Sequence, residues 1–190
     1  MHDGIFNEET RAKALEELAR FGESKGFTFS KFESLGDEII MLAGTRWEHD
    51  GIIDLIKEQV PRGRFCKLSS VDLLLTSDPG EPVPALVVVP DQLKPGAKPW
   101  AHETELLVEV VSQRNYREDY HGKRRRYAES GAPQYLLVDP REGVCVLHDG
   151  PQKAEGKYRN VTKSVFGESI RGLLCMDGRD LDTSEFPRYV

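Results

Sequence analysis

The stretch that decides the fold runs from Glu105 to Pro140 and reads ELLVEVVSQRNYREDYHGKRRRYAESGAPQYLLVDP. An apolar run surrounds Glu109, a strongly charged segment follows and ends at Gly131, and a second apolar run extends from Tyr135 to Val138. Two short apolar runs separated by a polar segment of helical length are typical of a strand, a helix and a second strand. Such a unit can form a right-handed crossover between two strands of one sheet.

Glu109 is the residue of this stretch that most needs an explanation. It lies inside an apolar run, and a charge in a buried strand is costly unless it is paired or binds a cation. One interpretation is a buried acid satisfied by an arginine or a backbone amide. The other is an acid with a chemical role.

The charged segment that follows predicts a helix from Tyr116 to Ser130, with Gly131 in the position of a C-terminal cap. Four residues lie at i, i+4, i+7 and i+11 and therefore share one face: Tyr116, Tyr120, Lys123 and Tyr127. A lysine among tyrosines on the inward face either extends past them to solvent or meets a carboxylate or a phosphate.

The same segment is rich in arginine. Arg124, Arg125 and Arg126 form either a solvated helix face or a surface that contacts phosphates, and Arg114 is a further candidate for such a contact. Overall, however, the chain carries a net charge of −6 and has a pI of about 5.5. That charge argues against a protein that coats nucleic acid by bulk electrostatics, but it leaves room for a local basic patch.

The rest of the chain alternates between helical and strand patterns. Helices are predicted from Asn7 to Gly22 and from Trp47 to Val60. Strands are predicted over Phe27–Phe32, Ile39–Leu42, Val71–Leu75, Ala85–Val89, Leu106–Val111, Tyr135–Val138 and Val144–His148. This order predicts an α/β fold in which a mixed β-sheet is flanked by helices.

Length and composition suit one domain over residues 1–190 that buries a sizeable core. No apolar run approaches the length of a membrane span, and the first residues show no secretory signal pattern. The cysteines at 66, 145 and 175 are far apart and form no metal-binding or disulfide motif. A cytoplasmic location without membrane contact is therefore expected.

The motifs along the chain resemble those of the Uma-type endonuclease family, which belongs to the restriction-endonuclease-like PD-(D/E)XK superfamily. The resemblance rests on LLVEVVS at residues 106–112, on the lysine and tyrosine at 123 and 127, on GAPQY at 131–135 and on VDP at 138–140. The segment around Glu33 is similar to the family's hairpin, and His49 falls where the family has a histidine. Judged by residue type alone, the alternative is that His49 is an ordinary surface histidine or one whose hydrogen bonds are satisfied within the fold.

The resemblance implies a nuclease site with a bound cation. Glu109 would be a ligand of Mg²⁺ or Mn²⁺, and Lys123, with Tyr127 beside it, would be the family's lysine, placed on the helix because position 111 is valine. Carboxylates hold such hard cations through oxygen, and the cation polarises a phosphate and helps to generate a hydroxide nucleophile. Lysine stabilises the charge that develops in the transition state.

One position departs from the family pattern. Ala85 stands where the family has its second metal-binding residue, an aspartate, and a methyl group cannot hold a cation. Three accounts remain open: an engineered inactivating substitution, a degenerate nuclease, or a compensating acid. Asp72, on a strand expected to pair with that of Ala85, is the best compensating candidate, and Asp91 is a weaker one.

Three functions follow from these observations. The first is a metal-dependent endonuclease acting on DNA, weakened or silenced at Ala85 and expected to form a homodimer. The second is a binding module that kept the fold without catalysis. The third is an enzyme that uses Glu109 and Lys123, without metal, on a small-molecule substrate.

Overall fold

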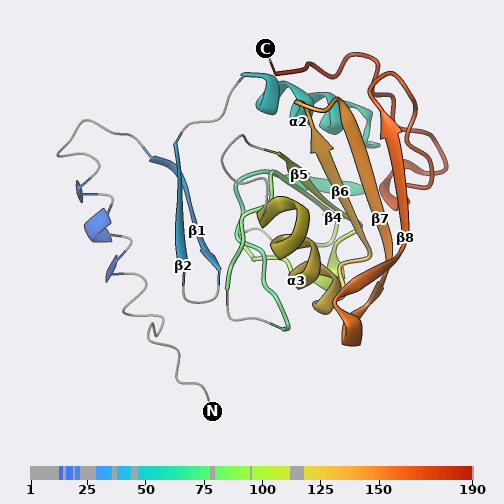
Figure 1. The fold of residues 1–190 in the computed structure, drawn as a ribbon. Helices are drawn as coiled ribbons and strands as arrows, with labels where there is room; N and C mark the ends of the chain where they lie inside the picture. Colours follow the sequence, from blue (N-terminus) through green and yellow to red (C-terminus); the bar gives the residue numbers. More distant parts are fainter. Residues whose placement is uncertain are drawn as a thin grey trace.

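The computed structural model describes residues 13–14, 16–18, 20–21, 29–35, 38–43, 47–77, 80–94, 96–111 and 118–189, with the backbone alone at 29–35, 38–43 and 118–120. The described residues between 13 and 21 are helical, as predicted for the first helix. Strands β1 (Phe29–Leu35) and β2 (Glu38–Ala43) form an antiparallel two-stranded sheet of their own, which confirms the predicted strand pair (Figure 1).

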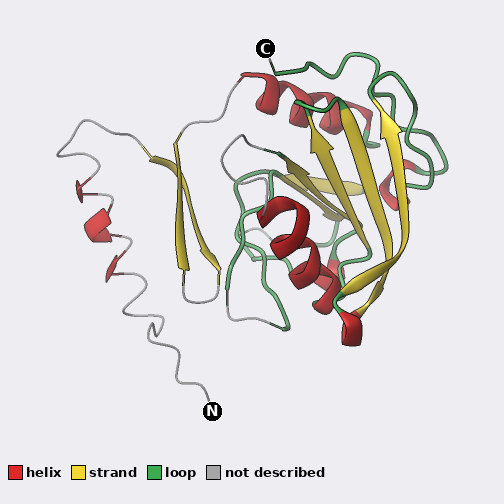
Figure 2. Ribbon diagram, viewed as in Figure 1, coloured by secondary structure: helices red, strands yellow, loops and turns green. Residues whose placement is uncertain are grey.

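A six-stranded mixed sheet forms the centre of the fold (Figure 2). Its strands are β3 (Phe65–Leu68), β4 (Leu86–Pro90), β5 (Leu106–Val110), β6 (Gln134–Asp139), β7 (Val144–Gln152) and β8 (Lys157–Val165), and they lie in this order across the sheet. The predicted mixed sheet flanked by helices is therefore confirmed.

The pairing directions divide this sheet into two halves. In the first half, β4 pairs antiparallel with its neighbours β3 and β5. In the second half, β7 pairs antiparallel with its neighbours β6 and β8. The pair β5–β6 is parallel, with Glu109 opposite Leu137. A parallel pair needs a crossover connection, and the helical segment after residue 118 supplies it, as the strand–helix–strand pattern predicts.

One helix covers each face of the sheet. Helix α2 (Trp47–Gln59) was predicted to within one residue, and its isoleucines at 52, 53 and 56 pack in a core cluster with Val108 and Leu136. The crossover begins as a π-helix, η2 (Glu118–Lys123), and continues as helix α3 (Arg124–Glu129). Tyr127 and Ala128 of α3 pack on the other face with Leu107 and Tyr135.

The C-terminal segment covers the α2 side of the sheet. Ile170 and Leu181 form an isolated antiparallel bridge, and a short 3-10 turn, η4 (Leu174–Met176), lies between them. Ile170, Met176, Leu181 and Phe186 are buried in the same cluster as the α2 isoleucines. The tail carries no regular hydrophobic pattern because it packs through irregular turns rather than through a helix or a strand.

The prediction of a strand over Val71–Leu75 is wrong. This segment makes one isolated parallel bridge, between Leu74 and Trp100, and the strand beside β4 is instead β3. Leu73 and Leu75 are apolar because they pack in the cluster beneath α3. Strand β3 has four residues, all half-buried, and such a short edge strand gives a weak alternation signal.

No helix among the described residues is long and apolar enough to cross a membrane. Cys66, Cys145 and Cys175 are all free thiols, as their spacing predicts. Burial raises the pKa of Cys145 and that of Cys175 to about 12, so both thiols stay protonated at neutral pH.

Candidate functional site

Glu109 lies on β5, next to the parallel seam at the centre of the sheet. Its neighbours along the strand on the same face, Leu107 and Val111, are fully buried beneath α3. Glu109 itself is 4% exposed, so its carboxylate has been taken out of water. A carboxylate in this position requires compensation from nearby donors or cations.

Lys123 and Tyr127 supply that compensation. The Lys123 Nζ donates to the Glu109 Oε1 at 3.0 Å, and the Tyr127 hydroxyl donates to the same oxygen at 3.0 Å. Lys123 is 3% exposed and Tyr127 is fully buried. The lysine therefore meets a carboxylate instead of extending past the tyrosines to solvent.

The helical register explains how two side chains reach one carboxylate. Lys123 ends the π-helix and Tyr127 lies one turn later on α3, so both project from the same face toward β5. Ser130 ends α3, and Gly131 at φ 78° turns the chain into β6. Tyr116 lies outside the described residues, as does the side chain of Tyr120.

A row of aromatic rings extends from this contact toward the edge of the sheet, and no sequence motif indicated it. Tyr127 meets Tyr135 edge-on at 5.2 Å between ring centroids, Tyr135 stacks on His148 at 5.5 Å, and His148 meets Tyr158 at 5.7 Å. The signal that was available is an aromatic residue on each of β6, β7 and β8, but their register could not be read from one sequence.

Burial keeps this row uncharged. Burial, with the nearby Arg124 charge as a second cause, lowers the pKa of His148 to about 4. Burial also raises the pKa of Tyr158 far above its ordinary value, with the Asp149 charge as a second cause. The His148 Nδ1 and the Tyr158 hydroxyl have no hydrogen-bond partner among the described residues.

Two tyrosine-to-phenylalanine changes should therefore differ in their effect on stability. Tyr127→Phe removes a donor to a buried carboxylate and should lower the free energy of unfolding by about 1.5–3 kcal/mol. Tyr158→Phe removes a hydroxyl without a partner and should be neutral or slightly stabilising. Urea denaturation of both variants at pH 7 measures the difference, and equal losses would contradict the assignment of the Tyr127 hydrogen bond.

Ala85 lies one step beyond the paired part of β4. The β4–β5 register joins Leu86 to Val108 and Val87 to Leu107, so its continuation places Ala85 opposite Glu109. The ladder stops at Leu86, the chain bends at Ala85, and Ala85 is 7% exposed within the α2-side cluster. The backbone of residue 85 therefore lies near that of Glu109, but the Ala85 methyl group packs on the α2 side of the sheet, whereas the Glu109 carboxylate meets Lys123 and Tyr127 on the α3 side.

The described side chains do not fit the magnesium site that the family resemblance implies. One oxygen of Glu109 accepts hydrogen bonds from an ammonium and a phenol, and the position implied for the second acid carries a methyl group that packs on the other face of the sheet. Nowhere in the described ranges do three or more His, Cys, Asp or Glu side chains gather as a metal site would need. The donor set here is one carboxylate already neutralised by a lysine.

The predicted compensating acids have other partners. The carboxylate of Asp72 lies 3.1 Å from the Lys98 Nζ, and Lys98 also pairs with Glu81 at 2.8 Å. Both pairs are partly exposed to solvent. Asp91 accepts a hydrogen bond from the thiol of Cys66 at 3.1 Å.

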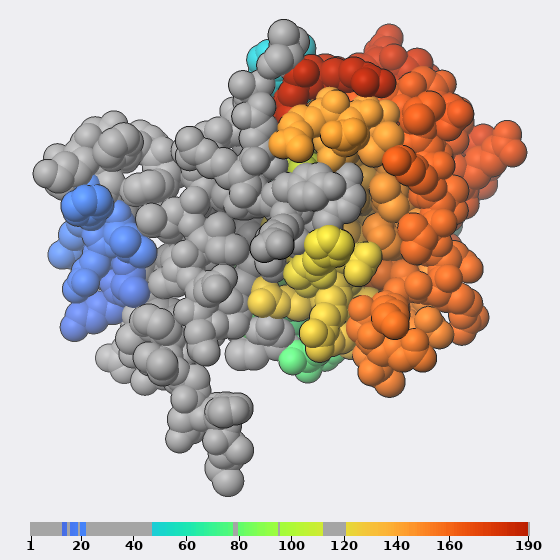
Figure 3. Space-filling view, viewed as in Figure 1, coloured from blue at the N-terminus to red at the C-terminus, as the bar shows by residue number. Residues whose placement is uncertain are grey.

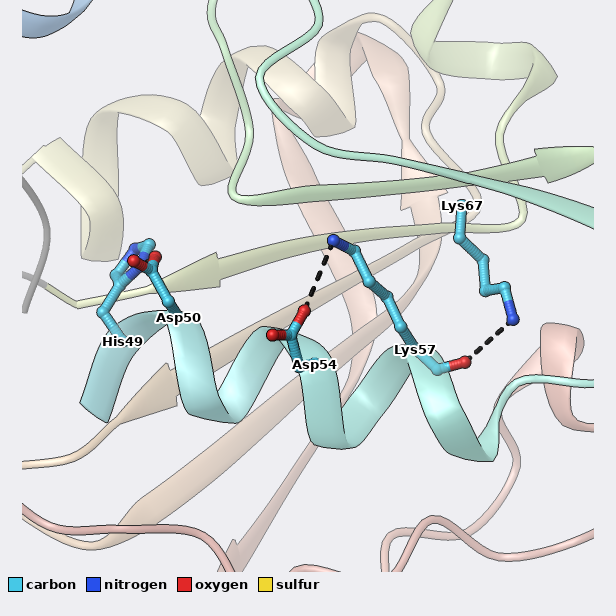
Figure 4. A network of polar contacts seen from close by, with 5 residues as sticks. All are labelled: His49, Asp50, Asp54, Lys57 and Lys67. Carbon is cyan, nitrogen blue, oxygen red and sulfur yellow. Dashed lines mark hydrogen bonds and ion pairs between the residues drawn. The ribbon is translucent and has the colours of Figure 1, made fainter. Parts of the chain in front are cut away.

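His49 lies in the first turn of α2, where its Nδ1 is 3.0 Å from Asp50 Oδ1 (Figure 4). The same helix carries the pair Asp54–Lys57 at 3.6 Å, and the Lys57 carbonyl accepts a bond from Lys67 of β3. The first two contacts lie within α2, and the Lys67 bond joins the helix to β3 at the edge of the sheet. Glu33 lies on β1, and its side chain is outside the described part of the structure.

The three consecutive arginines of α3 differ in how far they are exposed to solvent. Arg125 is exposed and pairs with Glu129 at 2.7 Å, whereas Arg124 and Arg126 are half-buried. Arg124 lies near enough to His148 of β7 to lower the pKa of that histidine. Arg114, the fourth predicted nucleic-acid contact, falls outside the described residues.

Comparisons with known proteins agree on the kind of protein that the chain resembles. The sequence pattern of one family, Uma2, described as "putative restriction endonuclease", matches residues 26–184. The crystal structure of a protein from Anabaena variabilis, described as a putative nuclease belonging to DUF820, superposes with a TM-score of 0.64 at 12% identity. That superposition covers 86% of this chain and 94% of the other. No curated protein matches the sequence.

Proposed function

Because the chain belongs to the Uma2 family, we propose that it is a nuclease-like protein that binds DNA and whose phosphodiester-cleaving site is incomplete at Ala85. The observation that carries this proposal is the buried contact of Glu109 with Lys123 and Tyr127. These residues stand where the resemblance implies the family's acid and lysine. The missing element is the second carboxylate.

The charge balance of the Glu109 contact explains why this form should bind rather than cut. Without a second acid, the positive charge of Lys123 already neutralises Glu109, and little negative charge remains to attract a divalent cation. The resemblance to the PD-(D/E)XK superfamily implies that phosphodiester hydrolysis depends on a bound cation that activates water. The unmodified chain therefore keeps the fold and the surface for DNA while lacking efficient cleavage.

A small-molecule enzyme is a poorer account of the same residues. Glu109 and Lys123 are each at least 95% buried, and they satisfy each other's charge. An acid–base catalyst needs one of its two groups free to exchange a proton with a substrate. A cavity of about 350 Å³ does exist, but it lies between α2 and the C-terminal segment, against Leu55, Glu58 and Phe186.

The test combines binding and cleavage with the unmodified chain. We expect a gel-shift assay to show binding of a 30-base-pair duplex that weakens as salt rises, because phosphate contacts release counterions. We expect supercoiled plasmid incubated with the same protein and Mg²⁺ or Mn²⁺ to stay uncut above background. Failure to bind DNA would contradict the proposed function, and rapid cation-dependent cutting would contradict the incomplete site.

A further inference from the structure

Strand β8 is the edge of the sheet and is exposed along most of its length. Eight of its nine residues are exposed or half-buried, and the exception is Tyr158. Val161 is 59% exposed and Val165 is 47% exposed, which is unusual for apolar side chains on a central sheet. Neither face of the strand is covered between Arg159 and Lys163. An exposed edge of this length is a surface that needs an explanation.

The charge on this strand differs from that of the whole chain. Strand β8 carries Lys157, Arg159 and Lys163 and no acid, although the protein has a net charge of −6. None of these three cations makes an ion pair within the described part of the chain, whereas exposed Arg20 and Arg64 each have a carboxylate partner. The strand therefore presents uncompensated positive charge.

This basic strand adjoins the arginine-rich helix. A side chain at Gly156, the residue before β8, would collide with the Arg125 and Glu129 side chains, so α3 packs directly on the start of the strand. Helix α3 also contacts β7, where His148 pairs with Val161 in the middle of β8. Figure 3 shows the yellow atoms of α3 beside the orange atoms of the β7–β8 hairpin on one surface.

The same charges disfavour the usual partner of an exposed edge, a second copy of the strand. An antiparallel self-pairing centred on Val161 would place Arg159 directly opposite Lys163 in both copies. Like charges directly opposite one another destabilise a strand pair, and edge lysines are a common protection against such pairing. The positive charges of β8 therefore fit an anionic partner and do not fit a second copy of β8.

We propose that β8, through Lys157, Arg159 and Lys163, binds the phosphate backbone of duplex DNA next to the α3 arginines. This inference rests on the proposed function and names a DNA-binding surface three strands away from Glu109. Six residue steps from Lys157 to Lys163 span roughly 20 Å, which corresponds to roughly six base-pair steps along the axis of a DNA duplex. Phosphate contacts fix the position of a duplex without reading its sequence.

The test is a salt series of DNA binding with matched charge variants. The first variant replaces Lys157, Arg159 and Lys163 with alanine, and the control replaces Arg62, Arg64 and Lys94, three exposed cations near β3 and β4 at the other edge of the sheet. Fluorescence anisotropy with a 30-base-pair duplex gives the dissociation constant at each salt concentration. We expect the β8 variant to bind at least about 10-fold more weakly, with a salt slope smaller by about 2–3, and the control to keep the unmodified slope.

The outcomes separate this proposal from the proposed function. If the unmodified chain does not bind the duplex, the proposed function and the β8 surface both fail. If the β8 variant binds with the same slope as the unmodified chain, the β8 surface fails while DNA binding stands. If the β8 variant still binds DNA with the unmodified slope but turns from a monomer into a dimer in light scattering, the three cations protect the edge against pairing with a second copy instead of binding DNA. Circular dichroism confirms that both variants are folded.

Discussion

Ala85→Asp is expected to give the chain cation-dependent cleavage of plasmid DNA, at least about 100-fold above the unmodified protein. Leu86 pairs with Val108, so the backbone of residue 85 lies near that of Glu109. If the new side chain turns at the bend from the α2 side to the α3 side, the two carboxylates can share one hard cation. The substitution would add the acid that the family resemblance implies and this chain lacks.

The same variant has a readout that is independent of cleavage. Without a cation, the new carboxylate would lie at a buried position beside Glu109, and mutual repulsion should lower the melting temperature. Binding of Mg²⁺ to the folded state alone should restore it, because a ligand that binds only the folded state raises its stability. The unmodified chain should show no such cation-dependent rise.

Two controls make the result specific. Ala85→Asn has the same shape without the charge and should neither cut DNA nor respond to Mg²⁺. Adding Glu109→Gln to the Ala85→Asp chain should abolish the gained activity. The Ala85 methyl group packs in the α2-side cluster, so an aspartate that keeps this direction would only destabilise the protein, and a melting temperature that no cation restores would refute the proposed site.

Lys123→Met is expected to lower the free energy of unfolding by about 3–5 kcal/mol, the largest stability effect that the structure predicts. The change leaves the Glu109 carboxylate buried without its cationic partner, and the Tyr127 hydroxyl alone cannot offset the cost of removing a charge from water. Urea denaturation at pH 7 measures the loss. Lys94→Met, at an exposed position, should change the stability by less than about 0.5 kcal/mol.

The double variant Glu109→Gln with Lys123→Met tests the coupling of the two charges. Replacing both partners of a buried pair by neutral groups of similar size is often nearly neutral, so the double variant should be more stable than Lys123→Met alone. If instead the two losses simply add, Glu109 and Lys123 do not compensate each other, and the description of the site as a buried ion pair is wrong.

Much of the fold could be predicted because its central segments carry strong local patterns. The apolar runs of β4, β5 and β6 are buried on both faces and bounded by turn residues, and the α2 isoleucines repeat at helical spacing. The contact between Glu109 and the helix that follows it could also be predicted from the sequence. Lys123 and Tyr127 share a helical face, and a charge in a buried strand demands a partner.

The errors have a common physical origin. Val71–Leu75 looks like a strand because Leu73 and Leu75 are buried, but burial is a tertiary property that loop residues also reach. Strand β3 escaped prediction because a four-residue edge strand has little alternation to show. The partners of Asp72 and of Asp91 could not be foreseen, since each lies more than 20 residues away along the chain and depends on loops.

The parallel seam between β5 and β6 also bears on the order in which the molecule assembles. Each antiparallel half of the sheet joins strands that follow one another along the chain, and β6, β7 and β8 are linked by short turns. The seam forms only when the crossover segment closes, and closing a loop costs entropy before any contact across it is gained. Glu109 loses its water at that step, when Lys123 and Tyr127 arrive from the crossover. The residues proposed for chemistry thus also hold the seam at which the two halves of the nascent fold meet.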